Sequence, residues 1–287
     1  MRSIKNEYKP VFEPIAGLDT YRVMPTAQID QIDPFLFLNH HGPQIYPPNN
    51  GGLPFGPHPH RGFETLTYIF SGDIVHEDTG GFKSKIDAGG IQWMTAGSGL
   101  LHSERSSEEF LKNGGEVEVL QLWMNLPAKY KMVKPHYHGL QKPDIPSIKL
   151  DNGKVRVNLI SGEFNGQKGP VDSITGLTMT SIEFDSGGNF KTDVFKDQNI
   201  LFYVVKGKLE VNGRAVTKHS LIEFGNDDTR IEINAVEDGI ILFGYGKPLN
   251  EPIVAQGPFV MNTREEITQA IRDYQSGKMG IWKEEEH

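Results

Sequence analysis

The chain contains two similar stretches, one in each half, and this repeat limits the folds that are open to it. "TLTYIFSGDIVHED" (65–78) and "ILFYVVKGKLEVNG" (200–213) align so that a tyrosine, a glycine and an aliphatic residue coincide. The matched pairs are Tyr68 with Tyr203, Gly72 with Gly207, and Ile74 with Leu209. Each copy is predicted to form a strand, a glycine turn and a second strand. Two similar β-rich halves of roughly 120–130 residues are therefore the simplest organisation.

Other local patterns support an all-β chain with a single clear helix. The 32 glycines and 18 prolines are spread along the sequence, which is typical of many short strands joined by turns. Asn212-Gly213 lies between "LEV" and "RAV" and predicts a tight hairpin. Near the C-terminus, Thr263 and Glu266 have the spacing of a capping box. Apolar residues follow at helical spacing up to Tyr274, and Gly277 supplies the end of that helix.

Charge and cysteine content exclude several function classes. The formal net charge is −8, so no basic surface for nucleic-acid backbones is indicated. The chain has no cysteine, so a bound metal would need histidine or carboxylate ligands. No N-terminal apolar segment and no run of 18 apolar residues occurs, and a cytoplasmic location is the default expectation.

The segment "PHPHRGFE" (57–64) supplies candidate metal ligands. His58 and His60 are one residue apart, so on an extended backbone both imidazoles point to the same side. His102 and Glu104 have the same spacing beyond the predicted hairpin. Two antiparallel strands of a barrel would then offer three imidazoles and a carboxylate, a set that suits Fe(II), Mn(II), Ni(II), Cu(II) or Zn(II). Glu64, four residues after His60, is a further carboxylate that spacing alone does not exclude.

Several long motifs in this sequence resemble the pirin family of the bicupin superfamily. They are "DPFLFLNHHGP" (33–43), "PHPHRGFETLTYIFSG" (57–72), "IQWMTAGSGLLHSE" (91–104), "LQLWMNLP" (120–127) and "GPFVMNTREEITQAIRDYQSGKMG" (257–280). The resemblance implies two cupin (jelly-roll-like) β-barrels face to face. The expected domains are an N-terminal metal-binding barrel (1–130), a Pro-rich connection (131–152), and a C-terminal barrel without metal ligands plus the C-terminal helix (153–287).

The resemblance also implies one transition-metal ion per chain, with Fe(II) expected and Zn, Mn, Ni, Cu or Co as alternatives. Carried onto this sequence, the ligands are His58, His60, His102 and Glu104. In the general cupin pattern the carboxylate after His-x-His is a ligand, whereas in pirins the carboxylate after the third histidine takes that role. Glu64 is then expected to orient a ligand imidazole or Arg61 instead.

The repeat predicts that the second barrel has no metal site. The shift that brings Tyr68 onto Tyr203 carries the three histidine positions onto Asp193, Phe195 and Glu237. Phenylalanine cannot bind a metal ion, so the second copy is expected to keep the scaffold without the site.

The remaining histidines and large side chains have ordinary expected roles. His136 and His138 form a second His-x-His pair, which we expect in a solvated loop of the connection. His40 or His41 could approach the site mouth, whereas His76 and His219 are expected to be ordinary strand or turn residues. Three residues could line a flavonoid-sized pocket or fill the core, and core is favoured: Trp93, Met94 and Trp123.

Two functions follow from the resemblance. The first is a quercetin 2,3-dioxygenase-type oxygenase acting with O2 on flavonol or enolic aromatic substrates, with Glu104 as general base. The second is an iron-dependent, redox-sensing regulatory protein that acts on transcription or on metabolic enzymes through protein partners. A purely structural metal is the third option, disfavoured because closed structural zinc sites usually recruit cysteine. A monomer without direct nucleic-acid or membrane binding is expected.

Overall fold

The computed structural model describes residues 1–282 of the chain, which divides into two compact units. The first, called the histidine unit below, contains Phe12–Tyr21, Phe37–Lys142 and the segment from Asn250 onward. The second, called the apolar unit, contains Met1–Val11, Arg22–Leu36 and Pro143–Leu249. No helix among the described residues is long and apolar enough to cross a membrane.

The observed units differ from the expected domains 1–130 and 153–287 at both chain ends. Strand β1 (Ile4–Tyr8) pairs with β22 (Ser220–Phe224) and so lies in the apolar unit. Helix α2 (Arg264–Gln275) contacts β25 (Val254–Gln256) and β26 (Phe259–Met261), and all three lie in the histidine unit. Local sequence patterns assign a terminal segment to the half that it adjoins along the chain. They do not reveal a pairing partner in the opposite half of the sequence.

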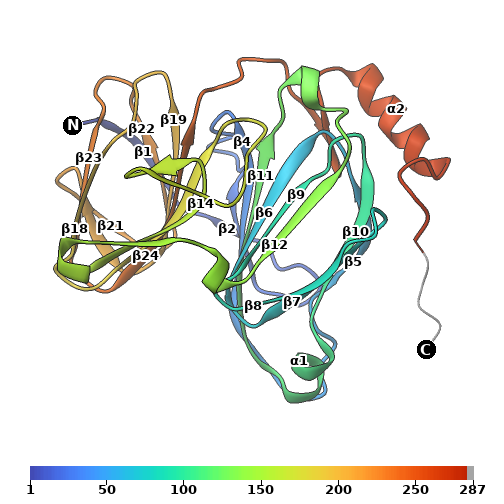
Figure 1. Cartoon of the computed structure of the whole chain (residues 1–287), viewed down its shortest axis with the longest axis horizontal. Helices are drawn as coiled ribbons and strands as arrows, with labels where there is room; N and C mark the ends of the chain where they lie inside the picture. Colours follow the sequence, from blue (N-terminus) through green and yellow to red (C-terminus); the bar gives the residue numbers. More distant parts are fainter. Residues whose placement is uncertain (283–287) are drawn as a thin grey trace. The chain divides into compact units, whose positions relative to one another are not determined.

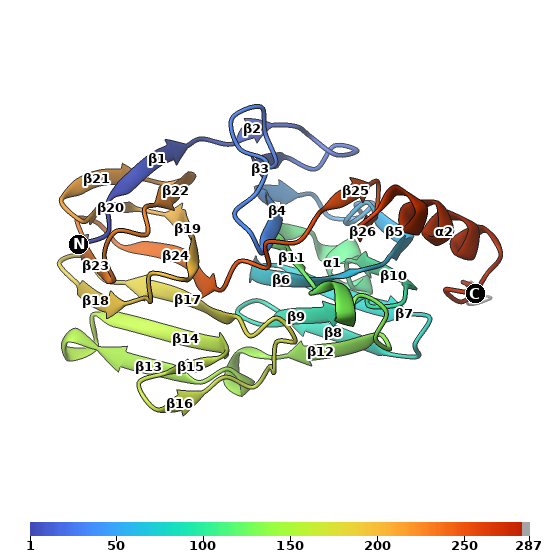
Figure 2. The same cartoon turned by 90° about the horizontal axis from the view of Figure 1, so that it is seen from above.

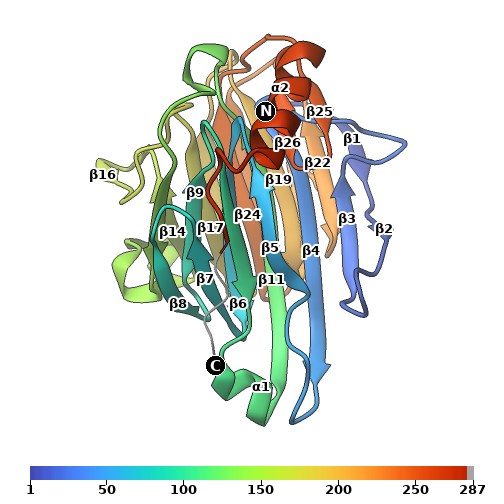
Figure 3. The ribbon, with the colours of Figure 1, turned by 90° about the vertical axis from the view of Figure 1, so that its right-hand side faces the viewer.

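The histidine unit is built from a seven-stranded and a four-stranded sheet (Figure 1). The larger sheet has the order β12 (His136–Leu140), β9 (Ile91–Thr95), β6 (Phe63–Ser71), β11 (Gly115–Asn125), β4 (Phe35–Tyr46), β3 (Thr20–Met24) and β2 (Val11–Phe12). The smaller sheet has the order β5 (Phe55–His60), β10 (Leu100–Arg105), β7 (Asp73–Asp78) and β8 (Lys83–Asp87). Figure 3 shows β4 and β11 running side by side to the end that carries α1 (Glu108–Asn113).

The apolar unit repeats this plan. Its larger sheet has the order β1, β22, β19 (Asn199–Lys206), β24 (Gly239–Gly246), β17 (Thr178–Phe184), β14 (Val155–Ser161) and β13 (Ser147–Leu150). Its smaller sheet has the order β18 (Asn189–Asp193), β23 (Arg230–Ala235), β20 (Lys208–Val211) and β21 (Arg214–Thr217). The short pair β15 (Glu163–Phe164) and β16 (Gln167–Lys168) and the 3-10 turns η1 (Ala128–Tyr130), η2 (Lys142–Asp144) and η3 (Asp151–Gly153) complete the chain.

The matching strand orders confirm the all-β fold with two barrel units. Strands β6 and β7 meet at Gly72, and β19 and β20 meet at Gly207, where φ is +82° and +88°. A side chain rarely adopts such φ values, so glycine is needed at both turns. The predicted Asn212-Gly213 hairpin joins β20 to β21, with positive φ at both residues. The repeat in sequence is therefore a repeat in topology.

The predicted C-terminal helix is present, and a second, shorter helix is not foreseen by the sequence patterns. Thr263 caps α2 in a reciprocal capping box with Glu266. Helix α1 is only six residues long and is capped by Ser107, whose hydroxyl accepts from the backbone N–H of Phe110. A helix this short has too few turns to show a periodic apolar face.

Residues 250–282, called the C-terminal strap below, pack against the turn between β5 and β6. The backbone N–H of Val260 donates to the carbonyl of Arg61 at 3.1 Å. The buried Lys131 ammonium donates to the carbonyls of Gly62 (2.7 Å) and Val260 (3.1 Å). Arg61 also forms an ion pair with Asp273 of α2 at 2.9 Å. Figure 2 shows β26 and α2 alongside β5, so the strap closes one side of the barrel.

Replacing Gly62 by alanine should destabilise the histidine unit more than the same change at Gly17. Both glycines have φ of +88°, so a side chain costs about 1–2 kcal/mol at either. A Cβ at Gly62 would also lie 2.0 Å from the carbonyl oxygen of Val260, whereas a Cβ at Gly17 meets nothing within 4 Å. We expect Gly62→Ala to lose roughly 1–3 kcal/mol more than Gly17→Ala in urea unfolding. Equal losses of unfolding free energy in the two variants would mean that the strap does not pack closely against Gly62.

Candidate metal centre

Three histidines from two antiparallel strands converge inside the histidine unit. Strands β5 and β10 pair so that His102 lies opposite His58 and Leu100 lies opposite His60. One ring nitrogen from each of the three histidines lies within 4.8 Å of the other two. The alternation of side chains on β5 and the register with β10 thus bring together the three imidazoles singled out from the sequence.

The free nitrogens of these histidines fit a metal ion. Nδ1 of His58 lies 2.7 Å from the Gly56 carbonyl and Nδ1 of His60 lies 3.3 Å from the Pro258 carbonyl, so Nε2 faces away from both contacts. Nε2 of His60 and both nitrogens of His102 are buried without a hydrogen-bond partner in the described part of the chain. Buried polar atoms are rarely left unsatisfied, and a cation at this point would supply a partner to the histidines.

Burial keeps the imidazoles of His60 and His102 in the neutral form that binds metals. Burial, followed by the neighbouring His58, lowers the pKa of His60 to about 3. Burial also lowers the pKa of His102 well below its ordinary value, with smaller effects from the other histidines. Neutral imidazole has the lone pair that a transition ion requires.

Glu104 follows His102 on β10 and is held by two hydrogen bonds. Its carboxylate accepts from the Thr67 hydroxyl at 2.9 Å and from the Gln121 side-chain amide at 2.7 Å. Among residues 1–282, the group of donor atoms within 4.8 Å of one another consists of the three histidines. Each carboxylate oxygen has two lone pairs, so one on each remains for a cation. Glu104 as a fourth ligand stays a prediction.

Glu64 lies on the opposite face of β6 from Thr67 because the two positions differ by an odd number of residues. Its carboxylate accepts from Trp93 Nε1 at 3.1 Å and from the Thr95 hydroxyl at 2.7 Å. The described hydrogen bonds of Arg61 go to Ser98 and Asp273 instead. These contacts tie Glu64 to β9 and not to Arg61, and its expected effect on a ligand imidazole stays a prediction.

Trp123 forms an aromatic wall beside the three histidines. Its ring lies 5.2 Å from His60, 4.4 Å from Phe63 and 4.5 Å from Phe37, where the two rings are stacked. Trp123 is partly exposed, as are His58, Phe37 and Gln121, so the histidines lie next to solvent. Trp93 and Met94 are each 1% exposed and belong to the core. The favoured core assignment thus fits these two residues but not Trp123.

His76 is not the ordinary strand residue that the sequence suggests. It is fully buried, with Nε2 2.9 Å from a carboxylate oxygen of Asp78. Its ring stacks on Tyr137 at 3.9 Å and lies 5.5 Å from His102. The signal that could have found it is the His-x-Asp spacing on β7, since β7 is the other hydrogen-bonded neighbour of β10.

The other histidines stay outside the centre. His136 and His138 lie on strand β12, which pairs with β9, rather than in an irregular connection. Their rings are 4.4 Å apart, but neither belongs to the donor group. His40 lies 3.0 Å from Glu118, and His41 lies 2.9 Å from the Thr20 hydroxyl. His219 adopts a positive φ after β21.

The equivalent region of the apolar unit is filled by aliphatic side chains. Gly72 and Gly207 occupy equivalent turns in the two units, so His76 corresponds to Val211. His76 pairs with Glu104, and Val211 pairs in the same way with Ile233. Ile231 and Ile233 then replace His102 and Glu104, and both belong to the unit's hydrophobic core.

The shift that aligns Tyr68 with Tyr203 does not hold outside the hairpins β6–β7 and β19–β20. Glu237 lies past the end of β23, and Phe195 is 74% exposed. Asp193 accepts a hydrogen bond from Thr229. In the part of the chain that the structure describes, the donor group of the histidine unit has no counterpart in the apolar unit.

Known families and structures match nearly the whole chain. The family model for pirin matches residues 17–124, and the model for the pirin C-terminal cupin domain matches residues 179–280. A Pseudomonas aeruginosa protein named as a candidate quercetin 2,3-dioxygenase is 37% identical over 265 residues, covering 92% of this chain and 91% of that protein. Pirin-1 of Arabidopsis thaliana is 38% identical over 263 residues, covering 89% of this chain and 87% of that one.

Among solved structures, one titled as quercetin 2,3-dioxygenase from Acinetobacter baumannii is similar over 98% of this chain and 99% of that chain. Its sequence identity to this chain is 34% and the TM-score is 0.91. The similarity extends through both barrels and the strap.

Removing the two histidines of β5 should abolish stoichiometric metal binding. We expect His58→Ala/His60→Ala to retain less than about a tenth of the ion bound by the wild-type chain, since two ligands are lost. The measurement is elemental analysis after purification without a metal-affinity tag. The matched control is His136→Ala/His138→Ala, which removes the other His-x-His pair and should keep the ion. Equal metal content in both variants would contradict the site.

Proposed function

This chain belongs to the pirin family, and from that premise we propose that it is a metal-dependent oxygenase of the quercetin 2,3-dioxygenase type. The substrate would be a flavonol or another enolic aromatic compound. The observation that carries the proposal is the set of three clustered imidazoles beside the partly exposed Trp123. The names of a Pseudomonas relative and of an Acinetobacter structure support the same reaction class.

We propose that His58, His60, His102 and Glu104 hold one transition ion per chain, with Fe(II) the expected ion. A bound ion of this kind supplies a Lewis acid for an enolic hydroxyl and a redox centre for chemistry with O2. The imidazole orientation comes from the protein. The carbonyls of Gly56 and Pro258 lie beside Nδ1 of His58 and His60, leaving Nε2 for the ion.

Glu104 is proposed to accept the proton of the substrate hydroxyl at a carboxylate oxygen. The hydroxyl of Thr67 and the amide of Gln121 hold the carboxylate in place and keep one lone pair on each oxygen free. A fixed carboxylate loses less entropy when it meets the substrate, which favours proton transfer.

Trp123 is proposed to bind the flat ring system of the substrate. Its indole is already packed between Phe37, Phe63 and His60, so its orientation is fixed before a ligand arrives. Since Phe37 and Phe63 cover the two faces of the indole, the substrate ring would meet its edge, and an edge-to-face contact adds about 0.5–1.5 kcal/mol beyond the area buried. The ring would therefore lie next to the histidines, with apolar surface excluding water from that side.

Oxygen uptake with quercetin tests the proposed reaction. The protein loaded with Fe(II) should consume O2 in a flavonol-dependent manner, and His58→Ala/His60→Ala should not, because two of its ligands are missing. Consumption is followed with an oxygen electrode and flavonol loss by absorbance. No metal-dependent uptake by protein that holds its ion would remove the oxygenase proposal for this substrate and leave the regulatory alternative.

Changing Glu104 to glutamine tests whether this carboxylate accepts the proton, because the variant keeps the size of the side chain and removes the base. We expect Glu104→Gln to lower metal affinity by roughly 10–100-fold. At saturating metal, kcat should still fall by roughly 100-fold or more because the base is lost. The matched control is Glu116→Gln, an exposed carboxylate of β11 that accepts from the Ser71 hydroxyl, and it should leave kcat within about threefold. Thermal melting of both variants checks the fold, and equal kcat values would show that Glu104 is not the base.

A further inference from the structure

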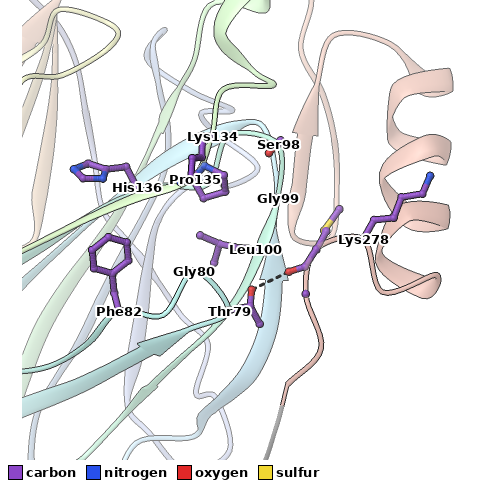
Figure 4. Close-up of a pocket in the computed structure, with 12 residues that line it drawn as sticks. Thr79, Gly80, Phe82, Ser98, Gly99, Leu100, Lys134, Pro135, His136 and Lys278 are labelled. Atoms are coloured by element: carbon purple, nitrogen blue, oxygen red, sulfur yellow. Dashed lines mark hydrogen bonds between the residues drawn. The ribbon is translucent and has the colours of Figure 1, made fainter.

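The histidine unit contains a hollow whose lining does not include the clustered histidines. It has a volume of about 650 Å³ and is called the lysine pocket below. Its walls come from four segments (Figure 4). They are Thr79, Gly80 and Phe82 after β7, Ser98–Leu100 at the start of β10, Lys134–His136 at the start of β12 and Lys278–Gly280 after α2. This volume lies in the range of small-molecule sites, about 300–1,000 Å³.

The lining carries positive charge and no carboxylate. Lys134 is exposed, and the structure gives its ammonium no hydrogen bond or ion pair within residues 1–282. Lys278 pairs with Asp273 at 2.8 Å, but that carboxylate also neutralises Arg61. One ammonium and one guanidinium thus share a single carboxylate, and Lys134 adds a further cation. The pocket is therefore suited to an anion.

One side of the lysine pocket is apolar and aromatic. Phe82 is 39% exposed and meets the ring of His136 edge to face, with centroids 5.9 Å apart. Figure 4 shows Phe82 and His136 on one side, Leu100 between the walls and Lys278 on the opposite side. Thr79 donates to the Met279 carbonyl at 2.8 Å, which ties the α2 side of the pocket to the barrel. An anion with an aromatic body fits these walls better than a small inorganic ion.

Backbone N–H groups do not favour a phosphate here. The N–H of Gly80 donates to Asp78, that of Gly99 to Ala96 and that of Gly280 to Gly277. Phosphate sites usually offer several free backbone donors or a planar guanidinium. The lysine pocket instead has separated ammonium groups and exposed ring surface.

We propose that the lysine pocket binds a small aromatic carboxylate, with the ring against Phe82 and His136 and the carboxylate beside Lys134. The site is separate from the metal centre and does not depend on the proposed oxygenase function. It would let the chain bind a carboxylate metabolite while the histidines hold an ion.

Titration calorimetry with benzoate tests this proposal. The protein used is the full-length His58→Ala/His60→Ala variant, because an aromatic carboxylate could also ligate a bound metal. We expect saturable 1:1 binding in the millimolar range, at least roughly fivefold weaker for benzamide, which has the same ring without the charge.

Two pocket variants and one control locate the site. In the same background, Lys134→Gln and Phe82→Ala should each weaken benzoate binding roughly fivefold or more. Lys129→Gln should not, because Lys129 is an exposed lysine that lies over the Tyr130 ring and not in the pocket. Thermal melting confirms that each variant is folded. The proposal is overturned if no saturable binding occurs, if benzamide binds equally well, or if the pocket variants bind like the Lys129 control.

Discussion

The pairing of β5 with β10 is the constraint on which the candidate metal centre depends. The antiparallel register sets His102 opposite His58, and the alternation within β5 turns His60 to the same side. The register shifts between His102 and Glu104, so Glu104 lies opposite Phe55 with an extra residue on β5. Such a bulge bends its strand and re-aims side chains. A slip of one residue in this pairing would turn His58 and His60 to the face opposite His102 and so separate the three imidazoles.

Much of this arrangement follows from the sequence, because it depends on periods and turns that local residues encode. A few neighbouring residues determine the geometry in three cases: the His58 and His60 pair, the Asn212-Gly213 hairpin and the capping box of α2. The direction of the Glu64 side chain could not be predicted from local spacing. Gly62, at φ of +88°, breaks the extended chain between β5 and β6, so alternation cannot be counted from His60 across the turn. The placement of β1 in the apolar unit, the placement of α2 in the histidine unit and the burial of His76 depend on partners far away in sequence.

The two units show how one scaffold supports opposite interiors. In the histidine unit, β10 carries His102 and Glu104, whose polar groups need partners from Thr67, Gln121 and, as proposed, an ion. In the apolar unit, β23 carries Ile231 and Ile233 at the corresponding places, packed in a continuous hydrophobic core. Burying an imidazole without a hydrogen-bond partner destabilises the fold, whereas burying an isoleucine side chain stabilises it. The apolar interior needs no ligand to be complete.

The strap has a consequence for how the protein matures in the cell. The carbonyl of Pro258 meets His60 across 198 residues of chain, and Arg61 reaches Asp273 across 212. While translation is in progress, the nascent polypeptide has made β5 and β10 but lacks the groups that fix His60 and close the barrel beside it. The orientation of His60 is therefore completed only when residues 258–273 have been added, long after the strands that carry the three histidines.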